Sequence, residues 1–392
     1  MDPEYDLHYI LNHLGEERER HRGAVAPPVY QTSNFCFDDV PAMRLALADE
    51  LKSSFYTRGN NPTVETLRRK LAALEGAEDA LAFSSGSGAV SAAVIAFVSQ
   101  GDHVVCVNRP YSWTRVLLRD MLPRFGVSTT FVDGTDSRNF ADAITEKTRM
   151  IVVESPNSMT FEQQDLRAVA DLAKAHGLIT LCDNSWASPL HQSPIACGID
   201  LVVHSATKYL NGHSDVVAGA VCGGHQLIQQ IFRGPFMTLG AVLSPHDAWL
   251  MIRGLRTLEV RMARIAQTTA EVAAFLAGHP KIRQLLMPGA PGDPQAELGA
   301  RQLKGQSGLL SIRVAADDLA AVDRFCASLE CFLLACSWGS YESLAFPVAC
   351  LMKEESYRST ANPLPYDLIR LSIGLEPASA LIADLESSLA QL

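Results

Sequence analysis

Short apolar runs alternate with longer segments of helical periodicity between about residue 66 and residue 222. Strands that are apolar on both faces and alternate with helices are typical of a parallel sheet. The pattern therefore predicts an α/β domain built on a mainly parallel sheet. The runs predict strands at 80–83, 103–107, 128–132, 150–153, 178–182, 201–203 and 217–222. The segments between them predict helices at 66–74, 89–98, 113–125 and 166–175.

The two ends of the chain depart from this pattern. Paired prolines at 27–28 exclude a helix and indicate an extended arm near the N-terminus. Beyond about residue 245, a long helical stretch is followed by sparser strands near 309–314 and 368–373, which predicts a smaller α+β domain. A chain of 392 residues is also long for a single core. We expect an arm, a large domain and a small C-terminal domain at 1–50, 51–245 and 246–392.

Composition narrows the possible partners. Hydrophobic residues make up 47% of the chain and charged residues 19%, which is enough apolar material for a globular core. A formal charge of -10 gives no electrostatic footprint for nucleic acid or for an anionic membrane surface. The longest apolar stretch, 88–98, is shorter than the roughly 20 residues that span a bilayer. A small-molecule partner is the expectation that remains.

The start of the chain shows no positively charged segment followed by an apolar core, so we expect no secretory signal. The nine cysteines are odd in number, scattered and without paired C-x-x-C spacing. This usage indicates reduced thiols and a cytoplasmic protein. The histidines do not cluster with these cysteines at ligand spacing, so no metal site is expected.

The most informative segment directly follows the strand predicted at 201–203 and carries Lys208 in a polar loop beside Ser205 and Thr207. A lysine can form an imine with an aldehyde cofactor, while neighbouring hydroxyls hold a phosphate oxygen. Taken alone, a solvated surface lysine in a polar turn is the commoner explanation of such a segment.

Asp183 ends an apolar strand about 25 residues before the lysine. In an open α/β sheet the carboxyl ends of the strands face the ligand crevice, so a buried carboxylate there needs a partner. A protonated pyridine nitrogen is such a partner, and the ion pair keeps the ring an electron sink. An aspartate after a strand is also often a helix N-cap, and Asp183 alone does not decide between the two.

A third segment, 84–88, places serines and glycines between a strand and an apolar helix. Backbone amides at a helix N-terminus, with glycine allowing close approach, form a phosphate site. A plain tight turn is the alternative. The spacing matches neither a Rossmann nor a P-loop motif, which argues against a nucleotide.

These three segments occur in the order and spacing of one known family. The sequence resembles the pyridoxal-phosphate (PLP) enzymes of cysteine and methionine metabolism, the transsulfuration family, over nearly its whole length. This resemblance implies the PLP-dependent transferase fold type I, with a large cofactor domain and a smaller C-terminal domain. The matching stretches are 23–30, 56–63, 84–86, 205–209, 253–258 and 370–376.

Roles follow from the resemblance where motif positions match. Lys208 is implied to hold pyridoxal 5'-phosphate as a Schiff base and Asp183 to pair with the ring nitrogen. Tyr111 resembles the tyrosine that stacks on the ring and takes part in catalysis, although a core aromatic is the alternative. The phosphate cradle is implied to comprise Gly86, Ser87, Ser205 and Thr207. The partner subunit's phosphate is implied to be bound by Tyr56 and Arg58, since arginine clamps phosphate with two bonds.

Arg370 lies in an apolar strand pattern, where its charge would be costly without an anion beside it. The resemblance implies that it binds the α-carboxylate of the substrate, and a structural salt bridge is the alternative. Ser158, Ser337 and Trp338 are implied to line the same pocket. Trp338 could also be a packing residue, because an indole is large enough for the core.

Features of two branches of the family are mixed in the chain. The stretches 154–162 and 337–344 resemble bacterial cystathionine β-lyases. The stretch 56–63 is closer to γ-synthases and γ-lyases, and Cys336 replaces a residue tied to reaction choice in the family. We expect a carbon–sulfur lyase that eliminates at Cβ of cystathionine or a cysteine-type thioether, giving a thiol, pyruvate and ammonia.

Two other activities stay open at this point. One is γ-lyase or γ-synthase chemistry on methionine, cystathionine or an O-acylhomoserine. The other is amino transfer, which uses the same lysine and aspartate. In each case the substrate is a small amino acid, and we expect at least a homodimer and, by the resemblance, a homotetramer.

Overall fold

Two β-sheets organise the structure, a computed structural model that describes residues 6–352 and 363–392. The larger sheet has the strand order β1-β7-β6-β5-β4-β2-β3. Six of the seven predicted strands run in one direction, and β7 lies antiparallel between β1 and β6. The mainly parallel sheet predicted from the apolar runs is therefore confirmed. Its strands are β1 (Asp79–Phe83), β2 (His103–Val107), β3 (Ser128–Val132), β4 (Thr148–Glu154), β5 (Ile179–Asp183), β6 (Leu201–His204) and β7 (Gly219–Gly223).

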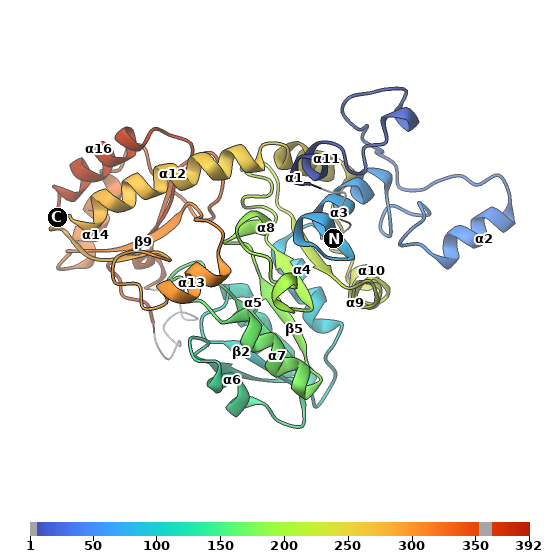
Figure 1. The fold of residues 1–392 in the computed structure, drawn as a ribbon, viewed down its shortest axis with the longest axis horizontal. Coiled ribbons are helices and arrows are strands. Elements are labelled where there is room, and N and C mark those ends of the chain that lie inside the picture. Colours follow the sequence, from blue (N-terminus) through green and yellow to red (C-terminus); the bar gives the residue numbers. More distant parts are fainter. Residues whose placement is uncertain (1–5, 353–362) are drawn as a thin grey trace.

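Helices cover both faces of this sheet (Figure 1). One face packs against α4 and α7 and the other against α3 and α11, each through a separate apolar cluster. Polar N-caps begin several of these helices, because an Asn, Ser or Asp side chain satisfies a free backbone amide there. The helices of this part are α3 (Pro62–Glu75), α4 (Gly86–Ile95), α5 (Ser112–Val116), α6 (Arg138–Ala143), α7 (Leu166–His176), α8 (Ser188–His191), α9 (His225–Ile231), α10 (Met237–Leu239) and α11 (Pro245–Leu255).

The smaller sheet has the order β10-β11-β12-β9-β8 and is mostly antiparallel. The helix predicted from residue 245 onward is divided into α11 and α12, and α12 contacts the apolar clusters of both sheets. The expected division at residue 246 stays a prediction. The strands are β8 (Ile282–Leu286), β9 (Leu309–Val314), β10 (Leu333–Leu334), β11 (Leu344–Pro347) and β12 (Leu368–Ser372). The helices are α12 (Leu258–Ala277), α13 (Ala296–Gln302), α14 (Leu319–Ala327) and α16 (Ala378–Leu389).

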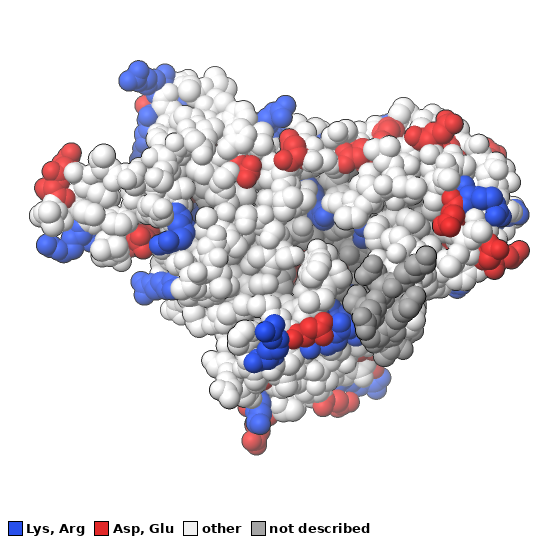
Figure 2. All heavy atoms as spheres, turned by 180° about the vertical axis from the view of Figure 1, so that it is seen from behind, with Lys and Arg blue, Asp and Glu red and all other residues white. Residues whose placement is uncertain are grey.

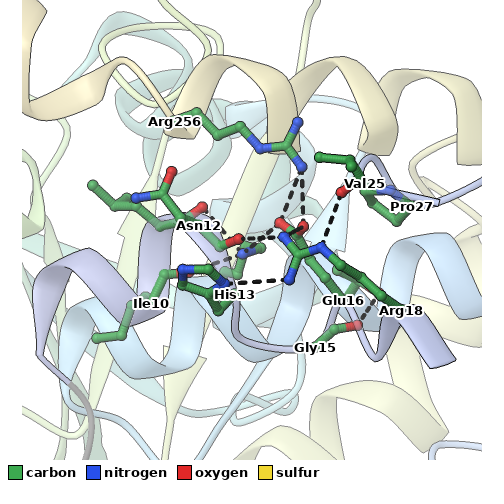
Figure 3. A network of polar contacts seen from close by, with 12 residues as sticks. Ile10, Asn12, His13, Gly15, Glu16, Arg18, Val25, Pro27 and Arg256 are labelled. Atoms are coloured by element: carbon green, nitrogen blue, oxygen red, sulfur yellow. Dashed lines mark hydrogen bonds and ion pairs between the residues drawn. The ribbon is translucent and has the colours of Figure 1, made fainter. Parts of the chain in front are cut away.

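The first part of the N-terminal segment packs against the large domain, and the part that carries helix α2 projects away from it. Helix α1 (Leu7–Asn12) contacts α3, and the neighbouring Glu16 is fully buried. Figure 3 shows Arg18 and Arg256 converging on this carboxylate, and Lys70 also forms an ion pair with it. Helix α2 (Val40–Ala48) instead projects from the body (Figure 1) and exposes several apolar side chains. Such exposed apolar surface often marks a protein–protein contact.

Charged residues of both signs are interspersed over the face drawn in Figure 2. No single-sign stripe of the kind that binds nucleic acid is visible on that face. Within the described residues, none of the helices is long and apolar enough to cross a membrane.

Candidate active site

The loop after β6 places Lys208 between the two sheets. Its ammonium nitrogen donates a hydrogen bond of 2.5 Å to Ser337 Oγ and lies 5.5 Å from the centre of the Trp338 ring. Ser337 has a backbone φ of 82°, a left-handed conformation that non-glycine residues adopt at a cost. The contact joins residues that are 129 positions apart. Lys208 is therefore half-buried beside Ser337 and Trp338, where loops of the two sheets meet, and is not the solvated surface lysine of the alternative explanation. This region between the loops is called the cleft below.

The surroundings of Lys208 favour its neutral amine. Burial, followed by the nearby Arg370 cation, lowers the pKa of Lys208 to about 8. A lysine with this pKa exchanges protons readily near neutral pH, which a solvated lysine does not.

Arg370 lies in the middle of β12 and is 8% exposed. It donates to the backbone carbonyls of Ser158 and Ser337, at 3.2 and 3.3 Å. Burial lowers its pKa to about 10. Within residues 6–352 and 363–392 no carboxylate forms an ion pair with this guanidinium, so the structural salt bridge is not found. A buried guanidinium without a carboxylate is suited to bind an anion from outside the chain.

Two carboxyl groups end neighbouring strands beside this cleft. Asp183 ends β5 and pairs in register with Glu154, which ends β4. Asp183 accepts hydrogen bonds from the amide and hydroxyl of Ser185, at 3.0 and 2.6 Å. Burial raises the pKa of Asp183. The next helix begins only at Ser188 with Ala187 as its N-cap, so Asp183 is not the helix cap that the sequence left open.

Glu154 is a site residue to which the sequence analysis gave no role. Its carboxyl accepts the backbone amides of Tyr111 and Ser158 and so joins two loops that border the cleft. Burial, followed by the neighbouring Asp183, raises its pKa to about 8. The signal was available in the sequence, since Glu154 ends a buried strand in the same way as Asp183 does.

The N-terminus of α4 faces the loop that carries Lys208. A Cβ atom on Gly86 would lie 2.9 Å from Ser205 Cα, so glycine is required for this close approach. The first amides of a helix have no partner within the helix and readily bind an anion. Gly86 and Ser87 are the first two residues of α4, and Gly86 lies against Ser205. The Thr207 hydroxyl donates a hydrogen bond to the backbone carbonyl of Ala218 and accepts one from the backbone amide of the same residue.

The tyrosines differ in where they lie. Tyr111 is 41% exposed and follows β2 at the edge of the cleft, so it is not a core aromatic. Partial burial of the side chain raises the pKa of Tyr111. The guanidinium carbon of Arg58 lies 5.4 Å from the centre of the Tyr56 ring, and both side chains are exposed. The hydrogen bonds of Lys208, Asp183 and Arg370 within the described chain include neither residue.

Comparison with known proteins identifies the family of the chain. Residues 10–390 match the family described as Cys/Met metabolism PLP-dependent enzyme. The chain belongs to this family. It is 38% identical over 381 residues to an L-methionine gamma-lyase of Pseudomonas putida, with 96% of this chain and 95% of the relative covered. It is 39% identical over 378 residues to a cystathionine gamma-synthase of Mycobacterium leprae, with 96% and 95% covered.

The fold comparison gives the same result. The crystal structure of metB from Corynebacterium glutamicum matches with a TM-score of 0.93 and 34% identity, covering 100% of this chain and 99% of that one. The fold type I architecture and the dependence on PLP are thereby confirmed. The residues in the cleft fit this cofactor, because an amide cradle, a lysine of lowered pKa and a buried carboxyl suit its phosphate, aldehyde and ring nitrogen.

Proposed function

We propose that the protein eliminates or replaces a group at Cγ of a sulfur amino acid or of an O-acylated homoserine. The observation that carries this proposal is the likeness to γ-lyases and γ-synthases along some 95% of both chains. It favours the γ-chemistry that the sequence left open over the β-elimination of cystathionine expected there. Ser158 and the Ser337–Trp338 pair still favour β-elimination as a second candidate.

Lys208 is proposed to hold the cofactor and then to move protons. Bound PLP stores the electron pair released when a bond at Cα of the substrate breaks. Reaction at Cγ requires removal of a second proton, from Cβ, so one base must give up and accept protons repeatedly. A lysine with a pKa of about 8 can do both near neutral pH, and Ser337 Oγ orients its amine.

Tyr111 is proposed to stack on the cofactor ring and to act as an acid. A tyrosine hydroxyl carries its proton at neutral pH, so it can donate that proton to the departing group. Asp183 would pair with the ring nitrogen. Gly86, Ser87 and Ser205 would bind the phosphate, and Thr207, through Ala218, would fix the loop that carries Lys208.

Arg370 is proposed to bind the α-carboxylate of the substrate, with Ser158, Ser337 and Trp338 around it. Replacing it with lysine should raise KM by roughly 10- to 100-fold, because an ammonium group cannot make the two parallel bonds of a guanidinium. Steady-state kinetics of the purified variant measure this effect.

A matched control lies on the neighbouring strand β9. Arg313 lies away from the cleft and donates two hydrogen bonds, each of 3.0 Å, to the carboxylate of Asp367. The Arg313→Lys variant should keep the KM of the parent while losing some thermal stability. Equal KM values for the Arg370→Lys variant and its parent would contradict the proposed role.

The assembly is also a proposal. The projecting helix α2 and the exposed Tyr56 and Arg58 support a homodimer in which each chain completes the partner's phosphate site. The family resemblance extends this to a homotetramer.

The keto acid formed distinguishes the two reactions. Purified protein is incubated with PLP and, separately, methionine, cystathionine, cysteine and O-acetylhomoserine. Elimination at Cγ gives 2-oxobutanoate and ammonia, which we expect, whereas elimination at Cβ gives pyruvate. O-Acetylhomoserine with cysteine would give cystathionine if the protein is a synthase. Pyruvate from cystathionine, with no product of γ-chemistry from any substrate, would refute the proposal. A keto acid without ammonia would indicate amino transfer.

A further inference from the structure

The loop that carries Tyr56 and Arg58 is anchored at both of its ends, although its tip is exposed. The loop begins at Leu51, which is 2% exposed and whose backbone carbonyl accepts a hydrogen bond of 3.1 Å from Arg68 on α3. It ends at Asn61, which is fully buried and is the N-cap of α3. The loop is therefore fixed where it leaves the body of the chain and where it returns to it.

The tip of the loop is held through the residue between the two exposed side chains. Tyr56 and Arg58 are exposed, whereas Thr57 is half-buried. The Thr57 amide donates to the backbone carbonyl of Ser33 at 2.9 Å, and its hydroxyl donates to the carbonyl of Thr32 at 2.5 Å. Because Thr57 is bonded to the N-terminal arm, its two neighbours are restricted in the directions in which they can point.

Asn61 joins the helix, the loop and the arm through one side chain. Its Oδ1 accepts the backbone amide of Thr63 at 3.0 Å, which is the N-cap contact of α3. Its Nδ2 donates to Thr57 Oγ1 at 3.1 Å and to the backbone carbonyl of Tyr30 at 2.9 Å. A helix N-cap requires only the first of these contacts. The two donated hydrogen bonds therefore have a purpose other than capping α3.

Such an anchor has a direct effect on how tightly an arginine in the loop can bind. A side chain on a loose loop loses conformational freedom when it binds an anion, and this loss lowers the affinity. A loop that is already fixed loses less. Arg58 is exposed, and its guanidinium lies over the ring of Tyr56 in the same loop. Its orientation therefore depends on how firmly the loop beneath it is held.

We propose that Asn61 is a positioning residue for the cofactor of the partner subunit. Through Thr57 it holds the loop so that Arg58 points toward the phosphate bound by the other chain. The inference rests on the cross-subunit role proposed above for Arg58. Its consequence is specific, because a change at Asn61 acts on the site of the partner chain and not on the site of its own chain.

The Asn61→Ser variant removes the anchor and keeps the helix cap. Serine is as good an N-cap as asparagine, but its side chain is too short to reach both Thr57 and Tyr30. The Tyr30 carbonyl keeps a second donor, the Thr32 amide at 3.0 Å. In the Lys208→Ala chain, where no covalent attachment contributes, Asn61→Ser should raise the Kd for PLP by about tenfold. Equilibrium dialysis measures this Kd.

A mixed dimer determines on which site Asn61 acts. One chain carries Lys208→Ala and the other Arg58→Ala, so the site of the second chain alone has both a lysine and an arginine. Asn61→Ser on the chain that supplies the arginine should raise the PLP concentration for half-maximal borohydride labelling of Lys208 by about tenfold. The same change on the chain that supplies Lys208 should leave this concentration unaltered. Different affinity tags on the two chains allow the mixed dimer to be isolated.

A helix cap far from the loop provides the structural control. Asp318 is the N-cap of α14 and accepts the backbone amide of Ala321 at 2.8 Å. Asp318→Ala should lower the melting temperature and leave the Kd for PLP as in the parent. An equal rise in Kd for Asp318→Ala and Asn61→Ser would mean that lost stability alone weakens binding, which would overturn the proposal.

Arg58→Ala separates this inference from the role on which it rests. This variant should raise the Kd for PLP, and adding Asn61→Ser to it should change nothing further. If Arg58→Ala leaves the Kd unchanged, the cross-subunit role is wrong and the inference fails with it. If Arg58→Ala weakens binding while Asn61→Ser does not, or if Asn61→Ser acts from the chain that supplies Lys208, the role of Asn61 alone is wrong.

Discussion

The Lys208→Ala variant should lose turnover by about 100- to 10,000-fold, the contribution typical of a general acid–base residue. It should also lose all covalent attachment of PLP. The structure gives the physical reason, since Lys208 has both a lowered pKa and an amine oriented by Ser337. Borohydride reduction followed by peptide mapping measures the attachment, and a labelled peptide that contains another lysine would refute the assignment.

Lys70 provides the matched control for this experiment. It is also buried, and burial likewise lowers its pKa to about 8, but it lies on α3 in the ion-pair network around Glu16. Lys70→Met should lower the melting temperature and leave both turnover and borohydride labelling at Lys208 intact. Labelling that depends on Lys70 would mean that a lowered pKa, and not the position in the cleft, selects the reactive lysine.

Mixing two inactive variants should restore activity if the chains complete each other's sites. In a dimer of Arg58→Ala and Lys208→Ala chains, one site has both its own Lys208 and the partner's arginine. Random pairing would then give roughly a quarter of the parent activity, because about half of the dimers are mixed and each has one intact site. Turnover after subunit exchange, with exchange confirmed by native mass measurement, tests this expectation.

A pair of residues from the same chain gives the control mixture. Asp183 and Lys208 act on each other electrostatically within one subunit. A mixture of Asp183→Asn and Lys208→Ala chains therefore contains no complete site and should gain nothing. Recovery in this control, or its absence from the Arg58 mixture despite proven exchange, would contradict the cross-subunit role of Arg58.

The site residues at the carboxyl ends of strands could be predicted from the sequence for a physical reason. A buried apolar run followed by a polar residue places that residue at the carboxyl edge of a parallel sheet, where Asp183 is indeed found. The same rule applied to Glu154, which ends the neighbouring strand, but its hydrogen bonds with the loops of Tyr111 and Ser158 are not legible in the sequence. Burial, followed by the Asp183 carboxyl beside it, raises the pKa of Glu154, whereas the hydrogen bonds from the loops of Tyr111 and Ser158 lower it.

Other features depended on packing that no local pattern reports. An apolar run has the same appearance in either direction, so β7 could not be recognised as antiparallel. The break between α11 and α12 is not marked by proline, and it occurs where Gly254 approaches Asn211 so closely that a Cβ would lie 2.3 Å from its carbonyl oxygen.

Local periodicity defined the strands of the larger sheet and most helices around it, because it depends on neighbouring residues. The motifs and their order along the chain defined the family and its cofactor, and both can be read before the chain folds. The tertiary structure decided the chemistry of the cleft. It brings Ser337 to Lys208 from 129 residues away and leaves Arg370 without a carboxylate partner among the described residues. Burial lowers the pKa values of Lys208 and Arg370, and the charge of Arg370 lowers that of Lys208 further. Neither effect exists until the two sheets have packed together.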